Sequence, residues 1–364
     1  MNVLFYLGHP AQYHFIKNSA RQLLENGHQV KILIKTKDIL EDLLKEDGWE
    51  YENIQKTYRK NSKFAILKAS FDRTISVLKT ARRFKADILI GTDSSIAQAG
   101  WLLRKPAITT LEDDIEVIGH LARLTYPFTT HIVVPTPCHV GKWEKKKIAY
   151  DGYMKLAYLH PKYFTPDENI VRNYGIKGKY VLIRLAKLVA HHDDGIGGLE
   201  SSLVKDIITQ VEEKGYRAYI SSEVKLNVEL EPYRLNIHYR DIHHVLSFAS
   251  LLISDSQSMS VEAAMLGTPS IRFSDFKGRI SVLEELEEKY QLTFGIKASE
   301  PSALKGTINE LIMMTDVRTT FQERRRKMLK ETIDVTAFIT WLIENYPESR
   351  ETMKKNPESQ FNFR

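Results

Sequence analysis

The chain has 364 residues, 43% of them hydrophobic, and a formal net charge of +6. This length exceeds what one hydrophobic core usually serves, and the composition excludes a disordered chain, so we expect two globular domains. The single cysteine, Cys138, excludes a disulfide framework and indicates a reducing compartment.

Apolar runs and charge clusters bear on location and partners. No apolar run has the length of a membrane span, and the start MNVLFYLGHP has no charged leader, so we expect a cytoplasmic protein. Basic residues cluster at 142–147 and 324–330, which we interpret as solvated surfaces or as peripheral contacts with the inner face of a membrane. Zinc-ligand, helix-turn-helix and RNA-recognition patterns are absent from the sequence, so we predict no nucleic-acid partner. The oligomeric state stays open.

The first half of the chain alternates short apolar runs with amphipathic segments, which is the pattern of strands alternating with helices. We expect strands over 3–7, 30–34, 51–54, 87–91, 106–110, 131–134 and 148–150, and helices over 13–26, 38–49 and 59–85 and from residue 95. This order implies a parallel sheet with right-handed crossovers. Ligands collect at the carboxyl ends of the strands in such a sheet.

Polar residues follow several of these strands at the edge where ligands collect. They are His9, Gln12, His14, Asp93 and Glu112. Two carboxylates at neighbouring strand ends would repel each other and raise one pKa, which suits a general acid or base. Each residue also has a structural alternative, because Asp93 can cap the helix after it and His14 can make a structural hydrogen bond at a helix start.

The segment 151–166 combines glycine, proline and aromatic residues without a period, which indicates a linker. We therefore expect a first domain over 1–164, a second over 165–345 and a frayed polar tail over 346–364.

In the second domain we expect strands over 180–185, 217–220, 237–239, 251–253 and 270–273, and helices over 203–215, 242–249, 259–266, 283–290, 302–314 and 332–345. Two stretches, 112–114 and 191–198, contain clustered acidic or histidine side chains. Neither has the spacing of a strong metal site, so we predict no metal.

The segment 251–272, LLISDSQSMSVEAAMLGTPSIR, organises this second half. An apolar run of strand length is followed by a small polar turn and a short helix. Gly267 then stands where a helix-ending glycine belongs, and Pro269 prevents the helix from continuing.

A turn that feeds a helix N-terminus presents backbone amides and the positive end of the helix dipole, which together suit a diphosphate. Ser256 and Ser258 add hydroxyl groups, and Glu262, about one turn into the helix, is placed to accept hydrogen bonds from a ribose diol. The alternative is an ordinary N-capped helix in which Glu262 interacts favourably with the helix dipole.

The segment resembles the nucleotide-binding stretch of GT-B glycosyltransferases and of the non-hydrolysing UDP-N-acetylglucosamine 2-epimerases. In those families a Ser-Gly-Gly turn holds the diphosphate and a glutamate holds the ribose. The matching turn here is Ser256-Gln257-Ser258, and the matching run is residues 262–269, EAAMLGTP. The missing glycine pair restricts the approach of the backbone to phosphate.

Over about residues 1–345 the chain is similar to a GT-B-like family catalogued as domain of unknown function 354. This resemblance implies an α/β fold of two Rossmann-like, doubly wound domains that face a central cleft. It implies the catalytic candidates Asp93, Glu112, His14 and His191. It implies the nucleotide-binding candidates Arg184, His243, Ser256, Gln257, Ser258 and Glu262.

The resemblance implies a glycosyltransferase that moves a sugar from a nucleotide donor, with UDP as the expected nucleotide, to a glycan or lipid-linked acceptor in surface polysaccharide synthesis. It implies no further cofactor. An epimerase acting on UDP-N-acetylglucosamine is a second hypothesis, supported by the placement of Asp93 and Glu112. A GT-B scaffold that binds sugar nucleotides without turning them over is a third.

Overall fold

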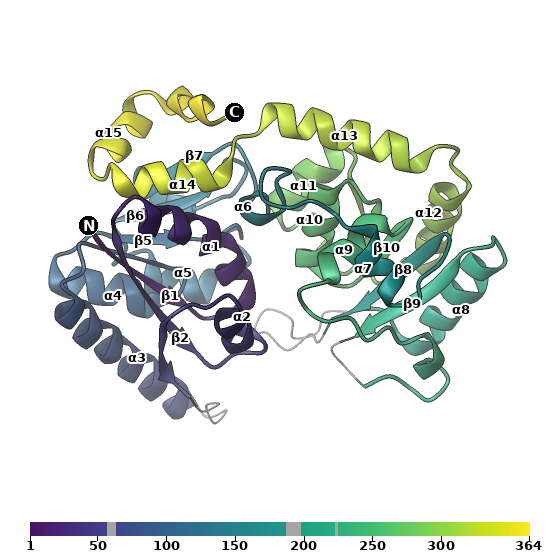
Figure 1. The fold of residues 1–364 in the computed structure, drawn as a ribbon, viewed down its shortest axis with the longest axis horizontal. Helices are drawn as coiled ribbons and strands as arrows, with labels where there is room; N and C mark the ends of the chain where they lie inside the picture. The colour runs from purple at the N-terminus through teal and green to yellow at the C-terminus, as the bar shows by residue number, and fades with distance from the viewer. Residues whose placement is uncertain (57–62, 187–197, 223–224) are drawn as a thin grey trace. The chain divides into compact units, whose positions relative to one another are not determined.

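The computed structural model describes residues 1–56, 63–186, 198–222 and 225–364, with the side chains of 63–67 left out. The chain divides into two compact units. Unit 1 comprises Met1–Tyr158 and Thr332–Arg364, and unit 2 comprises Leu159–Glu331. Each unit is a parallel α/β domain of the Rossmann-like type, which confirms the predicted fold class (Figure 1).

Unit 1 is built on a seven-stranded parallel sheet in the order β3-β2-β1-β4-β5-β6-β7. The strands are β1 (Asn2–Leu7), β2 (Gln29–Lys35), β3 (Tyr51–Gln55), β4 (Ile88–Gly91), β5 (Ala107–Thr110), β6 (His131–Pro135) and β7 (Lys147–Tyr150). The order reverses between β1 and β4, and such a switch point is where open α/β sheets bind ligands. The central strands are buried along their length because helices cover both faces.

The helices of unit 1 come from the first part of the chain and from its C-terminal end. They are α1 (Pro10–Glu25), α2 (Leu40–Glu46), α3 (Lys63–Phe84), α4 (Ser94–Leu103), α5 (Gly119–Thr125), α6 (Leu156–Leu159), α14 (Val335–Glu344) and α15 (Glu348–Lys355), with 3-10 turns η1 (Gly141–Lys146) and η3 (Pro357–Phe363). The helix α14 packs against α1. Gly152 leaves room for this packing, since a Cβ there would lie 2.7 Å from Val335 Cγ2.

Unit 2 has a five-stranded parallel sheet in the order β12-β11-β10-β8-β9. The strands are β8 (Tyr180–Leu185), β9 (Arg217–Ser222), β10 (Leu251–Ser254), β11 (Ser270–Phe273) and β12 (Thr293–Ile296). The helical elements are α7 (Glu168–Asn173), α8 (Ser201–Glu212), η2 (Glu231–Tyr233), α9 (Ile242–Phe248), α10 (Gln257–Leu266), α11 (Ser281–Glu288), α12 (Pro301–Met313) and α13 (Val317–Glu331). The switch point here lies between β8 and β10.

Three expectations about the elements are wrong. Residues 237–239 form no strand, and the nearby contact with the sheet is the isolated bridge between Ile220 and Arg234. The tail is not frayed, because it forms α15 and η3 and anchors itself to unit 1. There the ring of Phe363 packs against that of Trp341 with centroids 5.3 Å apart, and Gln360 Oε1 accepts a hydrogen bond from Asp151 N at 2.6 Å. The stretch 332–345, expected in the second domain, belongs to unit 1.

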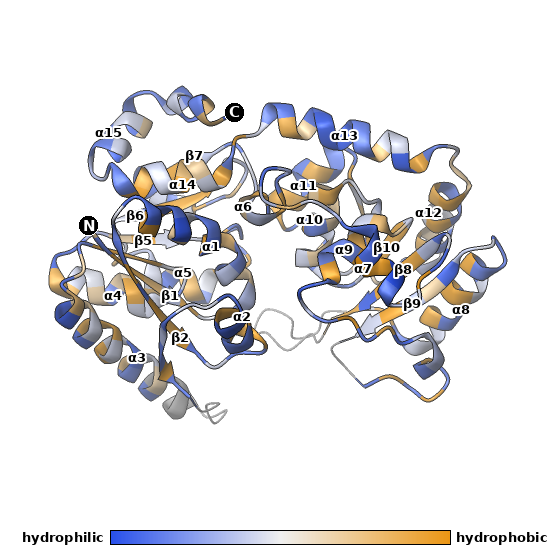
Figure 2. Cartoon of the chain, in the orientation of Figure 1, coloured by the Kyte–Doolittle hydropathy of each residue, from blue (hydrophilic) through white to orange (hydrophobic). Residues whose placement is uncertain are grey.

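The helix α13 contains the basic run expected to be a solvated surface. Its residues are mostly hydrophilic (Figure 2), yet Phe321 and Met328 are buried. Arg325 Nε donates to Met265 O at 2.5 Å, and Gln322 Nε2 donates to Leu266 O at 2.9 Å. These side chains satisfy carbonyl groups at the end of α10, where helical partners are lacking. Among the described residues, none of the helices is both long and apolar enough to cross a membrane.

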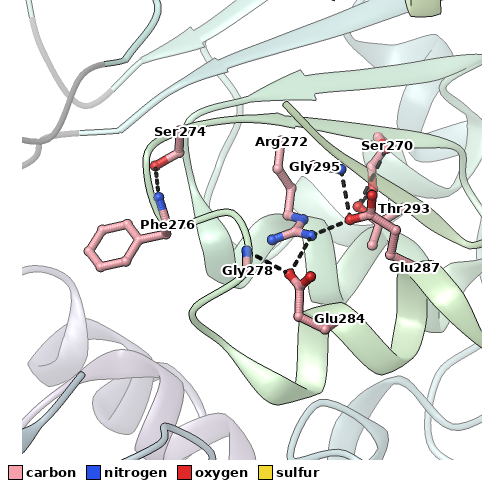
Figure 3. A network of polar contacts seen from close by, with 9 residues as sticks. All are labelled: Ser270, Arg272, Ser274, Phe276, Gly278, Glu284, Glu287, Thr293 and Gly295. Carbon is pink, nitrogen blue, oxygen red and sulfur yellow. Dashed lines mark hydrogen bonds and ion pairs between the residues drawn. The ribbon is translucent and has the colours of Figure 1, made fainter. Parts of the chain in front are cut away.

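A buried ion network joins β11, β12 and α11 in unit 2 (Figure 3). Arg272 is only 1% exposed, and its Nη2 atom lies 2.6 Å from Glu287 Oε2 and 3.4 Å from Glu284 Oε1. Gly295 donates from its amide to Glu287 Oε2 at 2.8 Å. A Cβ at Gly295 would lie 2.8 Å from Arg272 Nη2, so the missing side chain makes room for the guanidinium group.

We predict that Gly295→Ala lowers the free energy of unfolding by about 1–3 kcal/mol, because the added methyl group would displace the buried guanidinium group from its carboxylates. Urea denaturation measures this change. Gly306→Ala is the matched control, since a Cβ there meets nothing within 4 Å on α12. That control should be neutral or stabilising by up to about 1 kcal/mol. Equal stabilities for the two variants would contradict the packing role of Gly295.

Candidate functional site

The turn between β10 and α10 has the conformation expected from the sequence. Ser256 is the N-cap of α10, and its Oγ atom accepts a hydrogen bond from Met259 N at 3.4 Å. Ser254 Oγ accepts one from Ser256 N at 2.8 Å. Gly267 ends the helix in the left-handed conformation, with φ of 68°. The strand, polar turn, helix, glycine and strand therefore follow one another as predicted.

The capping alternative for Ser256 is present in this geometry, and it is compatible with anion binding. A serine cap occupies the amide of the third helical residue and leaves the helix dipole directed at the turn. Ser258 lies in the first helical turn and is half-buried. Gln257 donates weakly from Nε2 to Asp255 O at 3.4 Å, while its Oε1 atom is buried without a hydrogen-bond partner among the described residues.

Two of the predicted nucleotide residues lie together. His243, in the first turn of α9, places Nε2 at 3.4 Å from Glu262 Oε2 on α10. The two side chains are 10% and 12% exposed. Phe164 packs edge-on to His243 with ring centroids 6.1 Å apart. The contact fixes the orientation of Glu262, which is what a carboxylate acceptor for a ribose diol would need.

A row of polar residues crosses the unit 2 sheet near the carboxyl ends of its strands. Ser254 on β10 is in register with Arg184 on β8 and with Arg272 on β11. Residues opposite one another on neighbouring strands direct their side chains to the same face of a sheet. Arg184 Nη1 donates to Ser221 Oγ at 2.8 Å, while Arg272 is neutralised by glutamates of α11. The two arginines of this row thus differ in their contacts, because Arg184 is bonded to a serine of β9 and Arg272 to carboxylates of α11.

Sequence reasoning missed Asp255, which lies in the same turn between two serines. It is 6% exposed, and its Oδ1 atom accepts a hydrogen bond from Ala186 N at 2.7 Å. Burial raises the pKa of Asp255 to about 6, against the lowering effect of amide hydrogen bonds and of Arg184. The position of Asp255 directly before Ser256, a predicted phosphate contact, was the sequence feature that could have identified it. His191, predicted to lie near this turn, falls in 187–197, outside the described residues.

Asp93 follows β4 at the switch point of unit 1. Its side chain caps α4 by accepting hydrogen bonds from Ser95 N at 3.0 Å and Ser95 Oγ at 2.8 Å. Arg73 Nη2 lies 3.5 Å from its other oxygen. Burial alone would raise the pKa of Asp93, but Arg73, Lys35 and the bonds from Ser95 outweigh it and hold the pKa below its ordinary value. The expected elevation by a second carboxylate is therefore wrong for Asp93.

Glu112 follows β5 and forms a buried ion pair with Lys155. Both residues are 7% exposed, and Glu112 Oε2 also accepts a hydrogen bond from Met154 N at 2.9 Å. The pair connects the end of β5 to the segment that precedes α6. Truncating either partner of such a buried pair leaves an uncompensated charge, so this contact stabilises unit 1 whatever its chemical role.

His14 lies in the second turn of α1, past the loop where an edge residue was expected. Its ring stacks on that of Tyr158 with centroids 5.0 Å apart. The residue that occupies the loop is His9, which caps α1 by accepting a hydrogen bond from Ala11 N at 3.2 Å. Burial lowers the pKa of His9, so its imidazole is neutral near pH 7.

Three metal-ligating side chains meet in unit 1, although the sequence spacing indicated no histidine near the acidic run. Ligand atoms of Asp114, Glu116 and His139 lie within 4.8 Å of one another. These residue types could hold a divalent cation. One oxygen of Asp114 already accepts a hydrogen bond from His139 N at 2.7 Å, which ties the two loops together without an ion.

Comparisons with known proteins support the fold. No family model and no curated protein sequence matches the chain. Among solved structures, the UDP-bound MnaA of S. aureus has a TM-score of 0.67 at 12% identity, covering 96% of this chain and 97% of that one. The Neisseria meningitidis UDP-GlcNAc 2-epimerase bound to UDP-GlcNAc has a TM-score of 0.64 at 16% identity, covering 95% and 100%.

A glycosyltransferase-type relative is also among the matches. Acinetobacter baumannii MurG has a TM-score of 0.60 at 14% identity, covering 94% of this chain and 99% of that one. At these identities the likeness establishes the architecture alone. The chain therefore has the two-domain GT-B fold that 2-epimerases of UDP-GlcNAc share with MurG.

Proposed function

We propose that the protein is a sugar-nucleotide enzyme whose unit 2 binds a UDP-type donor. The observation that carries the proposal is the β10–α10 turn at the switch point of the unit 2 sheet, where a capped helix N-terminus, Arg184 and the Glu262–His243 pair occur together. A helix N-terminus and an arginine suit a diphosphate, and an oriented carboxylate suits a ribose diol.

The reaction we propose is transfer of the sugar to a glycan or lipid-linked acceptor. The turn amides and Arg184 would stabilise the negative charge that develops on the departing diphosphate. Asp93 or Glu112 of unit 1 would deprotonate the acceptor. Each carboxylate is held in position by a cation, Arg73 for Asp93 and Lys155 for Glu112.

Epimerisation is the second candidate. It is favoured by the placement of Asp93 and Glu112 after the neighbouring strands β4 and β5, as expected for the epimerase pattern. The missing Ser-Gly-Gly turn counts against it. Epimerisation needs an acid or base that exchanges a proton with the sugar, whereas transfer needs leaving-group stabilisation above all.

Incubation of the full chain with UDP-N-acetylglucosamine, followed by NMR spectroscopy, tests these alternatives. Release of UDP that depends on an added glycan or lipid-linked acceptor is the expected result. Formation of the manno isomer without acceptor would identify an epimerase. Binding without turnover on any acceptor would favour a non-catalytic binder. Failure of UDP sugars to raise the melting temperature would contradict the proposed function itself.

We predict that Glu262→Gln weakens UDP binding about tenfold, since a neutral amide is a poorer acceptor for the ribose diol than a carboxylate. Isothermal titration calorimetry measures the affinity, and circular dichroism checks the fold. Glu212→Gln on the exposed side of α8 is the control and should bind like the native chain. Unchanged affinity in Glu262→Gln would reject the ribose role.

We predict that Arg184→Ala weakens the binding of UDP about tenfold or more but that of uridine less than about threefold, because the guanidinium group faces the phosphates and not the base. Parallel titrations with the two ligands give this ratio. Arg217→Ala, an exposed arginine at the start of β9, removes the same charge away from the turn. Equal losses for UDP and uridine would exclude a diphosphate contact.

A further inference from the structure

Asp255 is a buried carboxylate in the middle of the proposed diphosphate site. Its neighbours in sequence are Ser254, whose hydroxyl accepts from the turn, and Ser256, which caps α10. The Asp255 carboxylate accepts the amide of Ala186, and the amide of Leu199 also donates to it. Asp255 therefore ties Ala186 and Leu199 to the β10–α10 turn.

Among the residues that the structure describes, the charged groups around Asp255 are held mainly by other partners. Arg184 of β8 attracts it, but the guanidinium group of Arg184 is hydrogen-bonded to Ser221. On β11, Arg272 is held by Glu284 and Glu287 of α11. On α10 and α9, Glu262 and His243 face each other. The negative charge of Asp255 is thus balanced chiefly by backbone amides.

An anion bound at the same helix N-terminus would compete for this positive environment. Two negative groups in one buried site cannot both stay ionised at low cost, and the carboxylate is the group that can take a proton near neutrality. Burial has already raised the pKa of Asp255 to about 6 in the unliganded protein, so a modest further rise brings it to physiological pH.

We propose that Asp255 is a positioning residue that couples diphosphate binding to the uptake of a proton. The ionised carboxylate holds the turn, Ala186 and Leu199 together before the ligand arrives. The protonated form keeps an acceptor oxygen for the amides while removing the repulsion toward the diphosphate. This inference rests on the proposed binding of a UDP-type ligand by unit 2.

The sign of the pH dependence follows from linkage. A bound anion raises the pKa of Asp255 above its unliganded value, so the complex holds more protons than the free protein. Affinity is then greatest below about pH 6 and falls as the pH rises, by up to about tenfold per pH unit, until the pKa of the complex is passed.

The test is isothermal titration calorimetry of the full chain with UDP-N-acetylglucosamine, whose doubly esterified diphosphate does not titrate near neutrality. Titrations at pH 7 in two buffers of different ionisation enthalpy give the number of protons exchanged. We expect an uptake of about 0.5–1 proton by the native chain and about zero by Asp255→Asn. The affinity of Asp255→Asn should vary little from pH 6 to 8.5.

Asp167→Asn is the matched control, because Asp167 also accepts a backbone amide, that of Asn169 at 2.9 Å, but on the exposed N-cap of α7. It should retain native proton uptake. Tight binding by the native chain without uptake would overturn the inference and leave the proposed function intact. Uptake that persists in Asp255→Asn would assign the proton to another group, such as His243, and overturn it too. Absence of any binding would overturn both proposals.

Discussion

The order of the strands is the constraint on which the candidate sites depend. In each unit a parallel sheet reverses its order once, between β1 and β4 in unit 1 and between β8 and β10 in unit 2. At such a point the connections leave to opposite faces and the carboxyl ends of two strands stay open to a ligand. Candidate residues of both units lie at or near these points, Asp93 after β4 in unit 1 and Arg184 and Ser254 on β8 and β10 in unit 2.

Electrostatics distinguishes the residues that collect at these edges. Three carboxylates each lie close to a basic side chain: Asp93 to Arg73, Glu112 to Lys155, and Glu262 to His243. Such pairs keep their side chains oriented. Asp255 differs because backbone amides carry most of its stabilisation. A buried carboxylate of this kind is the one most sensitive to another anion arriving nearby, which is why it stands out functionally.

Where sequence reasoning failed, the reasons are physical. The helix α13 has too few apolar positions to be recognised from hydrophobic periodicity. Its Arg325 side chain binds a carbonyl group at the end of α10, 60 residues earlier in the chain. The tail is polar in composition, but a few residues such as Phe363 and Gln360 hold it to unit 1. The apolar run at 237–239 forms no strand, and the bridge to β9 lies earlier, at Arg234.

The sequence by itself determined the α/β class, the alternation of strands and helices, and the turn, cap and glycine stop of 251–272, because these follow from local periodicity and local backbone chemistry. Only the tertiary structure decided which charges meet. Arg73 approaches Asp93, His243 approaches Glu262, and the amide of Ala186 approaches Asp255 across 69 residues of chain. Such encounters depend on strand order and register, which no local pattern encodes.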